Sequence, residues 1–388
     1  MTKETIYYVD RLGTGSLKWD GQKGVFGEEG LLPLWVADMD FRVPQSVLDA
    51  EKEYLETGVF GYYRPGIGYY RAFQAWEKEQ HGYEVQREWI RFAPGVVPAI
   101  NWLVQMFTKP QDAVMVLTPV YYPFLYAVRD NGRKLACCEL KNEAGRYGVD
   151  MEAFEAAIVQ NAVKCFILSS PHNPVGRVWS KAELKAMLDV CKAHGVLVIS
   201  DEIHQDLTFD GHKHIPSALA GDYDDMLITL TAASKTFNLA GCQNAFAVIP
   251  DAGLRAVYEG FTARMHIEGG NPFGYIAVEA AYRHGLSWLE EVRDIIWGNY
   301  CFVKDAFAAA LPGVCISPLE GTYLMWADFG QYLEQEEMAE FFQKKCRLAV
   351  DYGAWFEGNA LTHARFNLAT SRENVEKAVA AIVANLKG

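Results

Sequence analysis

The stretch LTAASKTFNLAG, residues 230–241, contains one lysine, Lys235, among small, hydroxyl and apolar residues. The apolar run at 226–230 predicts a buried strand, and Gly241 predicts a turn after it. A lysine in such surroundings loses hydration, which disfavours the ammonium form and leaves an amine able to act as a nucleophile and form a Schiff base. Alone, the pattern is more typical of a solvated lysine at a strand end, so its interpretation depends on the stretches around it.

Two other stretches follow apolar strands in the same way: SDEIH at 200–204 and SSPHNPVG at 169–176. In parallel sheets, ligands bind at the carboxyl ends of the strands, so Asp201, Asn173 and Lys235 are expected at one edge. Pyridoxal phosphate needs a lysine for its Schiff base and an acid beside its pyridinium nitrogen, which keeps the ring an electron sink. Lys235 and Asp201 supply that pair, and Asn173 offers an amide for the ring hydroxyl.

Five motifs then narrow the family: KWD at 18–20, PLWVADMDF at 33–41, GVVP at 95–98, TPVY at 118–121 and SKTFNLAG at 234–241. With them the sequence resembles the fold-type I pyridoxal phosphate enzymes, and among these the MalY/PatB type of cystathionine beta-lyases, also described as carbon–sulfur beta-lyases. The resemblance extends from about Asp10 to Arg372. It is specific because the motifs are many, ordered and spread along the chain.

The resemblance implies an α,β-elimination on L-cystathionine or a related L-cysteine S-conjugate, giving a thiol, pyruvate and ammonia. Lys235 is the implied base for the α proton, and Asp201 holds the pyridinium. Tyr121 is the implied aromatic that stacks on the ring, with Tyr122 as the alternative. Arg365, in the stretch 363–370, is the implied partner of the substrate carboxylate, because its planar fork binds carboxylates bidentately.

The remaining implied contacts surround the phosphate and the substrate. The backbone of Gly95, Val96 and Val97, at a predicted helix start, is expected to bind the phosphate. The side chains or backbone expected near the cofactor or the substrate are those of Thr231, Ser234, Asn173, His204, Ala37 and, from the neighbouring subunit, Tyr62. His204 stands where many relatives of the fold carry a tyrosine near the ring hydroxyl. Gln243 stands where many carry an arginine on the cofactor phosphate. The hydroxyls of Thr231 and Ser234 and the amides of 95–97 must therefore hold the phosphate with fewer charges.

Composition limits the other possibilities. The 388 residues carry a formal net charge of −13, from 36 basic and 49 acidic residues, which argues against a nucleic-acid surface. The eight cysteines show no CxxC spacing, so reduced thiols are expected and no metal site. The start of the sequence has no signal-peptide apolar core and no run is long enough to cross a bilayer, which predicts a cytoplasmic protein with no membrane partner.

Short apolar strands alternate with helical stretches, which predicts a doubly wound, mostly parallel sheet. The strands are expected at 113–117, 135–139, 164–168, 196–200, 227–231 and 245–249. The expected fold class is therefore α/β, the fold-type I pyridoxal phosphate-dependent transferase fold, with a large domain and a smaller α+β domain. We expect an irregular amino-terminal arm at 1–45 that joins the small domain, the large domain at 46–286 and the small domain at 287–388. If Tyr62 reaches a neighbour's cofactor, the enzyme is a homodimer.

Two other functions fit the same residues. An aminotransferase shares every step with the lyase until the β substituent leaves, so the residues alone do not separate the two reactions. The arm and the motif at 33–41 favour the lyase. A regulatory or binding protein that keeps the cofactor as structure is the third hypothesis, and it can coexist with catalysis.

Overall fold

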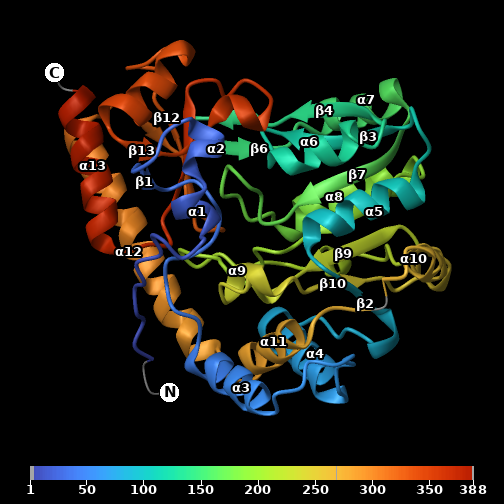
Figure 1. The fold of residues 1–388 in the computed structure, drawn as a ribbon. Coiled ribbons are helices and arrows are strands. Elements are labelled where there is room, and N and C mark those ends of the chain that lie inside the picture. Colours follow the sequence, from blue (N-terminus) through green and yellow to red (C-terminus); the bar gives the residue numbers. More distant parts are fainter. Residues whose placement is uncertain (1–3, 268, 387–388) are drawn as a thin grey trace.

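The computed structural model describes residues 4–267 and 269–386, and a seven-stranded sheet forms its centre (Figure 1). The strand order is β2-β10-β9-β8-β7-β3-β4. Strand β10 runs antiparallel to both of its neighbours, β2 and β9, and the other neighbouring pairs of this sheet are parallel. The sheet is therefore mostly parallel, as predicted. The strands are β2 Ile90–Ala93, β3 Ala113–Thr118, β4 Lys134–Glu139, β7 Val163–Ser169, β8 Leu197–Asp201, β9 Leu227–Thr231 and β10 Ala245–Val248.

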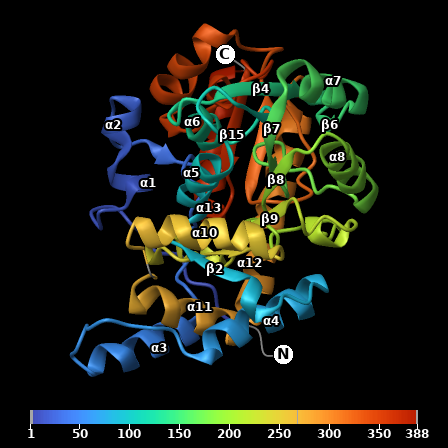
Figure 2. The same ribbon diagram turned by 90° about the vertical axis from the view of Figure 1, so that its right-hand side faces the viewer.

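Helices cover both faces of the sheet because successive side chains of a buried strand point to opposite sides. In β3, Met115 and Leu117 pack with one helical layer, whereas Val114 and Val116 pack with the other. The first layer is α7 Met151–Asn161 and α8 Lys181–Ala193; the second is α5 Val96–Phe107, α6 Tyr122–Arg129 and α10 Ala252–Arg264. Figure 2 shows α5 and α8 on opposite sides of β7 and β8. The sheet is therefore doubly wound, as predicted.

The carboxyl-terminal part forms a second sheet of four strands in the order β11-β12-β15-β14. Its strands are β11 Cys315–Ile316, β12 Leu324–Asp328, β14 Asp351–Tyr352 and β15 His363–Asn367, and α13 Arg372–Leu386 packs beside it. The 25-residue α12, Leu286–Ala310, connects it to the rest of the chain. Neither α12 nor any other helix within residues 4–267 and 269–386 is long and apolar enough to span a membrane.

The amino-terminal arm lies beside this second sheet (Figure 1). Strand β1 Leu32–Pro33 pairs in parallel with β13 Leu348–Ala349, as the expected link between arm and small domain requires. The domain boundaries at 45 and 286 remain predictions. Beyond the arm, α3 Gln45–Glu56 and α4 Ile67–His81 pack with α11 Pro272–His284. Further along the chain, β5 Lys141–Glu143 and β6 Arg146–Gly148 form a hairpin.

Four details differ from the sequence-based expectations. The arm is not wholly irregular, because it contains the short helices α1 Leu17–Asp20 and α2 Gln22–Phe26. The Lys18 side chain in α1 is completely buried, whereas the KWD motif by itself, without the family resemblance, predicts a surface turn. The helix expected near 335–345 is split into a 3-10 turn, Gln335–Glu337, and a π-helix, Glu340–Lys345. Strand β2 and helices α6 and α10 were not predicted.

Candidate functional site

A cavity of about 180 Å³ lies where β7 and β8 end, beside the one-turn helix α9 Ala233–Thr236. Parallel strands bring polar residues together at this edge, which is where the sequence predicts a ligand site. Ten of the predicted site residues line the cavity: Ala37, Gly95, Val96, Val97, Tyr121, Asn173, Asp201, His204, Ser234 and Lys235. Arg365, Thr231 and Tyr62 do not.

Lys235 projects from α9, directly after β9. Its Nζ donates a hydrogen bond of 2.6 Å to the carbonyl oxygen of Ala37 in the arm. Burial lowers the pKa of Lys235 to about 8, although the nearby Asp38 and Asp201 carboxylates oppose this shift. A lysine with such a pKa is roughly one tenth neutral at pH 7, far more than an ordinary lysine, and the neutral amine is the form that nucleophilic and proton-transfer roles require.

Asp201 is the last residue of β8 and is buried. Its Oδ1 accepts a hydrogen bond of 3.0 Å from the backbone N–H of Ile203. Burial raises the pKa of this carboxyl to about 7, while that hydrogen bond and the Lys235 charge act in the opposite direction. Among residues 4–267 and 269–386, no side-chain cation forms an ion pair with Asp201, so its carboxylate is available to a positively charged ligand group.

Arg365 lies on β15 behind the cavity and reaches it through Asn173. Its Nη1 donates to Asn173 Oδ1 at 2.9 Å, and its Nη2 donates to the Trp35 carbonyl oxygen at 3.2 Å and to Asp351 Oδ2. Its buried Nε has no hydrogen-bond partner. Burial raises the pKa of Asp351 to about 6, against the effect of Arg365. The arginine fork is thus held in place with one N–H still unpaired.

Tyr121 and Asn173 meet through the backbone, because the Tyr121 N–H donates to the Asn173 carbonyl oxygen at 3.1 Å. The Arg365 guanidinium carbon lies 6.0 Å from the centre of the Tyr121 ring. Burial raises the pKa of Tyr121 to about 12, so the phenol stays protonated near neutrality. An aromatic face, an amide and an arginine therefore gather on one side of the cavity.

The start of α5 also lines the cavity and offers backbone N–H groups to an anion. Gly95 is the N-cap of the 12-residue helix α5, whose first N–H groups have no partners within the helix. Ser234 and Gln243 also line this cavity. The Oγ1 of Thr231 is buried without a hydrogen-bond partner, but Thr231 lies at the end of β9 outside the cavity lining.

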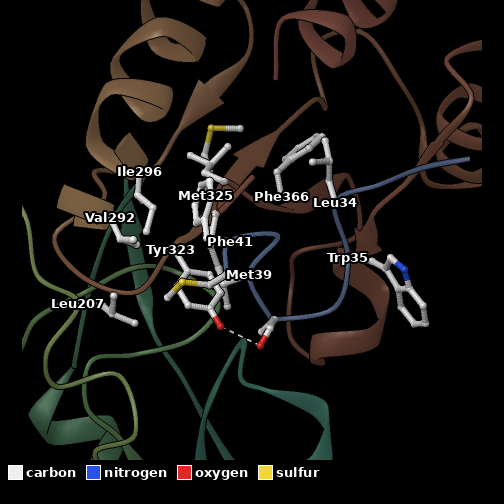
Figure 3. Packing of buried hydrophobic residues seen from close by; sticks show 14 of the residues in the cluster. Leu34, Trp35, Met39, Phe41, Leu207, Val292, Ile296, Tyr323, Met325 and Phe366 are labelled. Carbon is white, nitrogen blue, oxygen red and sulfur yellow. Dashed lines mark hydrogen bonds between the residues drawn. The ribbon is translucent and has the colours of Figure 1, made fainter. Parts of the chain in front are cut away.

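Ala37 connects the arm to the site. Its carbonyl oxygen accepts the Lys235 hydrogen bond and a second one, of 2.8 Å, from the Tyr323 hydroxyl. Figure 3 shows Tyr323 among the buried hydrophobic residues, with a dashed hydrogen bond at its hydroxyl. Asn238 holds Met39, two residues further along the arm: its Oδ1 accepts from the Met39 N–H at 2.9 Å, and its Nδ2 donates to the Met39 carbonyl oxygen at 3.0 Å. The prediction placed Ala37 near the substrate, and the structure places its backbone against Lys235.

His204 is buried at the cavity wall, with its ring edge-on to Tyr323 at 5.8 Å. Its Nδ1 has no hydrogen-bond partner. Burial holds the pKa of His204 well below its usual value, and the Lys235 and Arg365 charges act in the same direction. His204 is therefore a neutral imidazole at the position expected beside the cofactor ring.

Sequence reasoning missed several residues of the site. Ser169 ends β7 and lines the cavity, so the same strand-end rule that found Asp201 could have found it. Asn244 also lines the cavity and accepts a hydrogen bond of 2.7 Å from the Tyr69 hydroxyl on α4, a contact across 175 positions that no local pattern predicts. Tyr323 and Asp351 were missed for the same reason, since each acts through a contact with a distant residue.

Tyr62 is fully exposed and lies outside the Lys235 cavity. It lines a separate, open hollow of about 1330 Å³ together with Arg64 and Tyr275. Its expected contact with the cofactor of a neighbouring subunit stays a prediction, and its exposed position is one from which a second chain can be reached.

Comparisons with known proteins agree with this geometry. The chain is 40% identical over 379 residues to cystathionine beta-lyase PatB of Bacillus subtilis (strain 168), covering 96% of this chain and 98% of PatB. The crystal structure of the PLP-bound C-S lyase from Staphylococcus hominis matches with a TM-score of 0.93 and 34% identity, over 98% of this chain and 97% of that one. Cystalysin from Treponema denticola, whose structure contains pyridoxal 5'-phosphate, matches with a TM-score of 0.93 and 35% identity, over 100% and 99% of the two chains. Since residues 29–382 also match the aminotransferase class I and II family, the chain belongs to that family.

Proposed function

We propose that this protein is a pyridoxal phosphate-dependent carbon–sulfur beta-lyase. It catalyses α,β-elimination on L-cystathionine or a related L-cysteine S-conjugate and gives a thiol, pyruvate and ammonia. The observation that carries the proposal is the meeting of Lys235, Asp201 and Asn173 at one cavity, with Arg365 bonded to Asn173. The similarity to PatB, named a cystathionine beta-lyase, over nearly the whole of both chains supports this reaction in particular.

The cavity residues fit pyridoxal phosphate. Lys235 offers an amine whose pKa burial lowers, and Asp201 offers a buried carboxyl for a protonated ring nitrogen. Asn173 offers an amide, and the start of α5 offers free backbone N–H groups for the phosphate. When bound, the cofactor supplies an electron sink for the bonds of the substrate α carbon.

The protein residues then have distinct tasks. Arg365 binds the substrate α-carboxylate, for which its Nε is free and its Nη1 can be shared with Asn173. Lys235 removes the proton from the α carbon, and its lowered pKa gives it the neutral form that this step requires. Asp201 stays ionised beside a positively charged ring nitrogen because the opposite charge offsets its burial. Tyr121 covers one side of the ring.

We further infer that the enzyme is a cytoplasmic homodimer in which Tyr62 of one chain reaches the cavity of the other. The apolar side chains of Val59, Phe60 and Ile67 are exposed around Tyr62, which is typical of a surface that another chain covers. The large domain at 46–286 holds the cavity, and the parts at 1–45 and 287–388 form the small domain around it.

An aminotransferase is the second candidate. The family match itself carries the description aminotransferase class I and II, and every residue named above serves that reaction equally. The two functions differ in whether the β substituent of the substrate leaves, so product analysis separates them.

The test is to mix the purified holoprotein with L-cystathionine and to measure pyruvate, free thiol and the visible absorbance of the bound cofactor. The proposal expects both products in equal amounts. Lys235→Ala is expected to lower kcat by about 10³-fold or more, whereas Arg365→Ala is expected mainly to raise KM, by about tenfold to a hundredfold. Keto acid formed only with a keto-acid acceptor and without thiol would favour the aminotransferase. Normal turnover by Lys235→Ala would contradict both candidates.

A further inference from the structure

Behind Lys235, on the side away from the cavity, lies a buried carboxylate that the proposed reaction does not use. Asp206 is buried and accepts three side-chain hydrogen bonds. Its Oδ1 faces the Trp76 Nε1–H at 2.9 Å and the His81 Nε2 at 2.8 Å, both from α4. Its Oδ2 accepts from the Thr236 hydroxyl at 2.6 Å. Thr236 is the neighbour of Lys235 in α9 and is completely buried.

The α9 turn needs such an anchor. It has only four residues, and a single helical turn is unstable by itself because its few hydrogen bonds do not offset the entropy of ordering its backbone. Side chains that follow Lys235 in the chain tie it down instead. Thr236 bonds to Asp206 towards α4, and Asn238 bonds to Met39 in the arm. The chain directly after Lys235 is therefore anchored at two residues, on two different parts of the protein.

The anchor on the α4 side is rigid and charged. His81 faces Asp206, and its side chain is almost completely buried, so the two groups form a shielded ion pair. The Trp76 ring also packs edge-on against Phe237, the residue after Thr236, at 5.4 Å. Hydrogen bonds to a charged acceptor are about twice as strong as neutral ones, so the Thr236 hydroxyl is held more firmly by this carboxylate than by a neutral group.

We propose that Thr236, Asp206 and His81 are positioning residues that fix the turn carrying Lys235, so that its Nζ is aligned for proton removal at the substrate α carbon. This inference rests on the proposed function and adds residues to it. None of the three lines the cavity, so they act only through Lys235. Their loss should therefore lower the rate of proton transfer and weaken the hold on the cofactor, and it should leave substrate binding at Arg365 unchanged.

The experiment compares Thr236→Val with Thr236→Ser in the holoenzyme. Valine keeps the shape of the side chain and removes the hydroxyl, whereas serine restores the hydroxyl. Thr236→Val is expected to lower kcat about tenfold while KM changes less than about twofold, because small misplacements of a catalytic group cost rate rather than binding. The kinetic isotope effect with α-deuterated L-cystathionine should rise, and the apparent Kd for pyridoxal phosphate should increase about fivefold. Thr236→Ser should stay within about twofold of the natural protein in all of these.

Thr108→Val is the matched control. Thr108 is also buried, and its hydroxyl also makes hydrogen bonds, to the Val104 carbonyl oxygen and from Arg133, but far from α9. This variant should lose stability and keep kcat, the isotope effect and the cofactor Kd. The inference is overturned if Thr236→Val keeps all three, if Thr236→Ser fails to restore them, or if Thr108→Val changes them equally. If the natural protein forms no thiol, the proposed function fails, and the cofactor Kd values still decide whether Thr236 positions Lys235.

Discussion

Burial shifts the pKa of single residues in this protein, downward for a lysine and upward for an aspartate. It lowers the pKa of Lys235 to about 8 and raises the pKa of Asp201 to about 7, so each group is close to losing its usual charge near neutrality. His81 behaves differently. Burial lowers its pKa, but the hydrogen bond and charge of Asp206 outweigh this and raise it to about 9. A nearby partner, rather than burial alone, thus decides which residues keep a full charge.

This difference predicts a dependence of stability on pH. The folded state raises the pKa of His81 from about 6.5 in an unfolded chain to about 9. This pKa difference stabilises the folded state by on the order of 3 kcal/mol. The stabilisation is fully present below the unfolded pKa of about 6.5 and is lost as the pH rises through the folded pKa of about 9. The measurement is the free energy of unfolding of the natural protein and of His81→Gln at about pH 6 and about pH 10.

The difference between the two proteins should be large at the lower pH and should shrink at the higher pH. Burial raises the pKa of Glu77 to about 7, so it also titrates in this range, and because the His81 charge lowers that pKa, Glu77 contributes to the difference between the two proteins. A difference that stays constant across this range would show that His81 stabilises the fold by packing alone.

At the scale of elements, buried charges hold two parts of the arm together. Lys18 Nζ in α1 donates to Asp40 Oδ2 at 2.9 Å, and both side chains are fully buried. Trp19 Nε1 also donates to Asp40, at 2.9 Å. These contacts fix the arm segment that includes Ala37, whose carbonyl oxygen meets Lys235. The short helix α1 therefore supports the cavity wall, although it does not touch the cavity.

Replacing Lys18 tests this link. Lys18→Met leaves Asp40 without its main cation in a buried place, which is expected to cost about 3 kcal/mol of stability and to raise KM because the Ala37 segment loosens. Thermal unfolding and steady-state kinetics measure both effects. Lys23→Met is the control in the adjacent α2, since Lys23 is exposed and only 3.6 Å from the exposed Glu29, so a change below about 0.5 kcal/mol is expected. Equal effects of the two variants would contradict the role of Lys18.

Local patterns predicted the elements that carry the site and missed the contacts that complete it. The strand at 227–231 and the helix at 181–193 have the predicted bounds, because their apolar spacing is regular. The KWD motif by itself, without the family resemblance, predicts a surface turn, since nothing near Lys18 in the sequence shows that Asp40 would bury it. The role of Arg365 at the substrate carboxylate stays a prediction, and the sequence did not show that its Nη1 would bond to Asn173. Such contacts are missed where a side chain depends on a partner far away in the chain.

At the scale of the whole molecule, the surface around Tyr62 bears on the proposed homodimer. The loop between α3 and α4 carries exposed Val59, Phe60 and Tyr62, beside an open hollow lined by Arg64 and Arg87. The same α4 that follows this loop supplies the two groups that bind Asp206. A partner chain that covers the loop would therefore also steady the helix behind Lys235.

Mixing two inactive variants tests the shared site. Lys235→Ala lacks the base, and Tyr62→Ala lacks the residue that the proposed dimer donates to its partner. In a mixed dimer the Tyr62→Ala chain keeps its lysine and receives Tyr62 from the other chain, so one of the two sites is complete. After equal mixing and subunit exchange, about a quarter of the normal activity is expected. Recovery of no activity, with exchange verified by mass, would show that Tyr62 does not serve a neighbour's site.

The hydrogen bonds of Asn367 also have a consequence for synthesis in the cell. Its Nδ2 donates to the Val36 and Asp38 carbonyl oxygens at 2.6 Å, across 331 and 329 positions of the chain. At translation rates of about 5–20 residues per second, the arm leaves the ribosome roughly 15–70 s before this asparagine exists. The Ala37 wall against Lys235 is therefore completed only when the last strands emerge, and a ribosome that stalls before residue 367 releases no chain able to close its cavity.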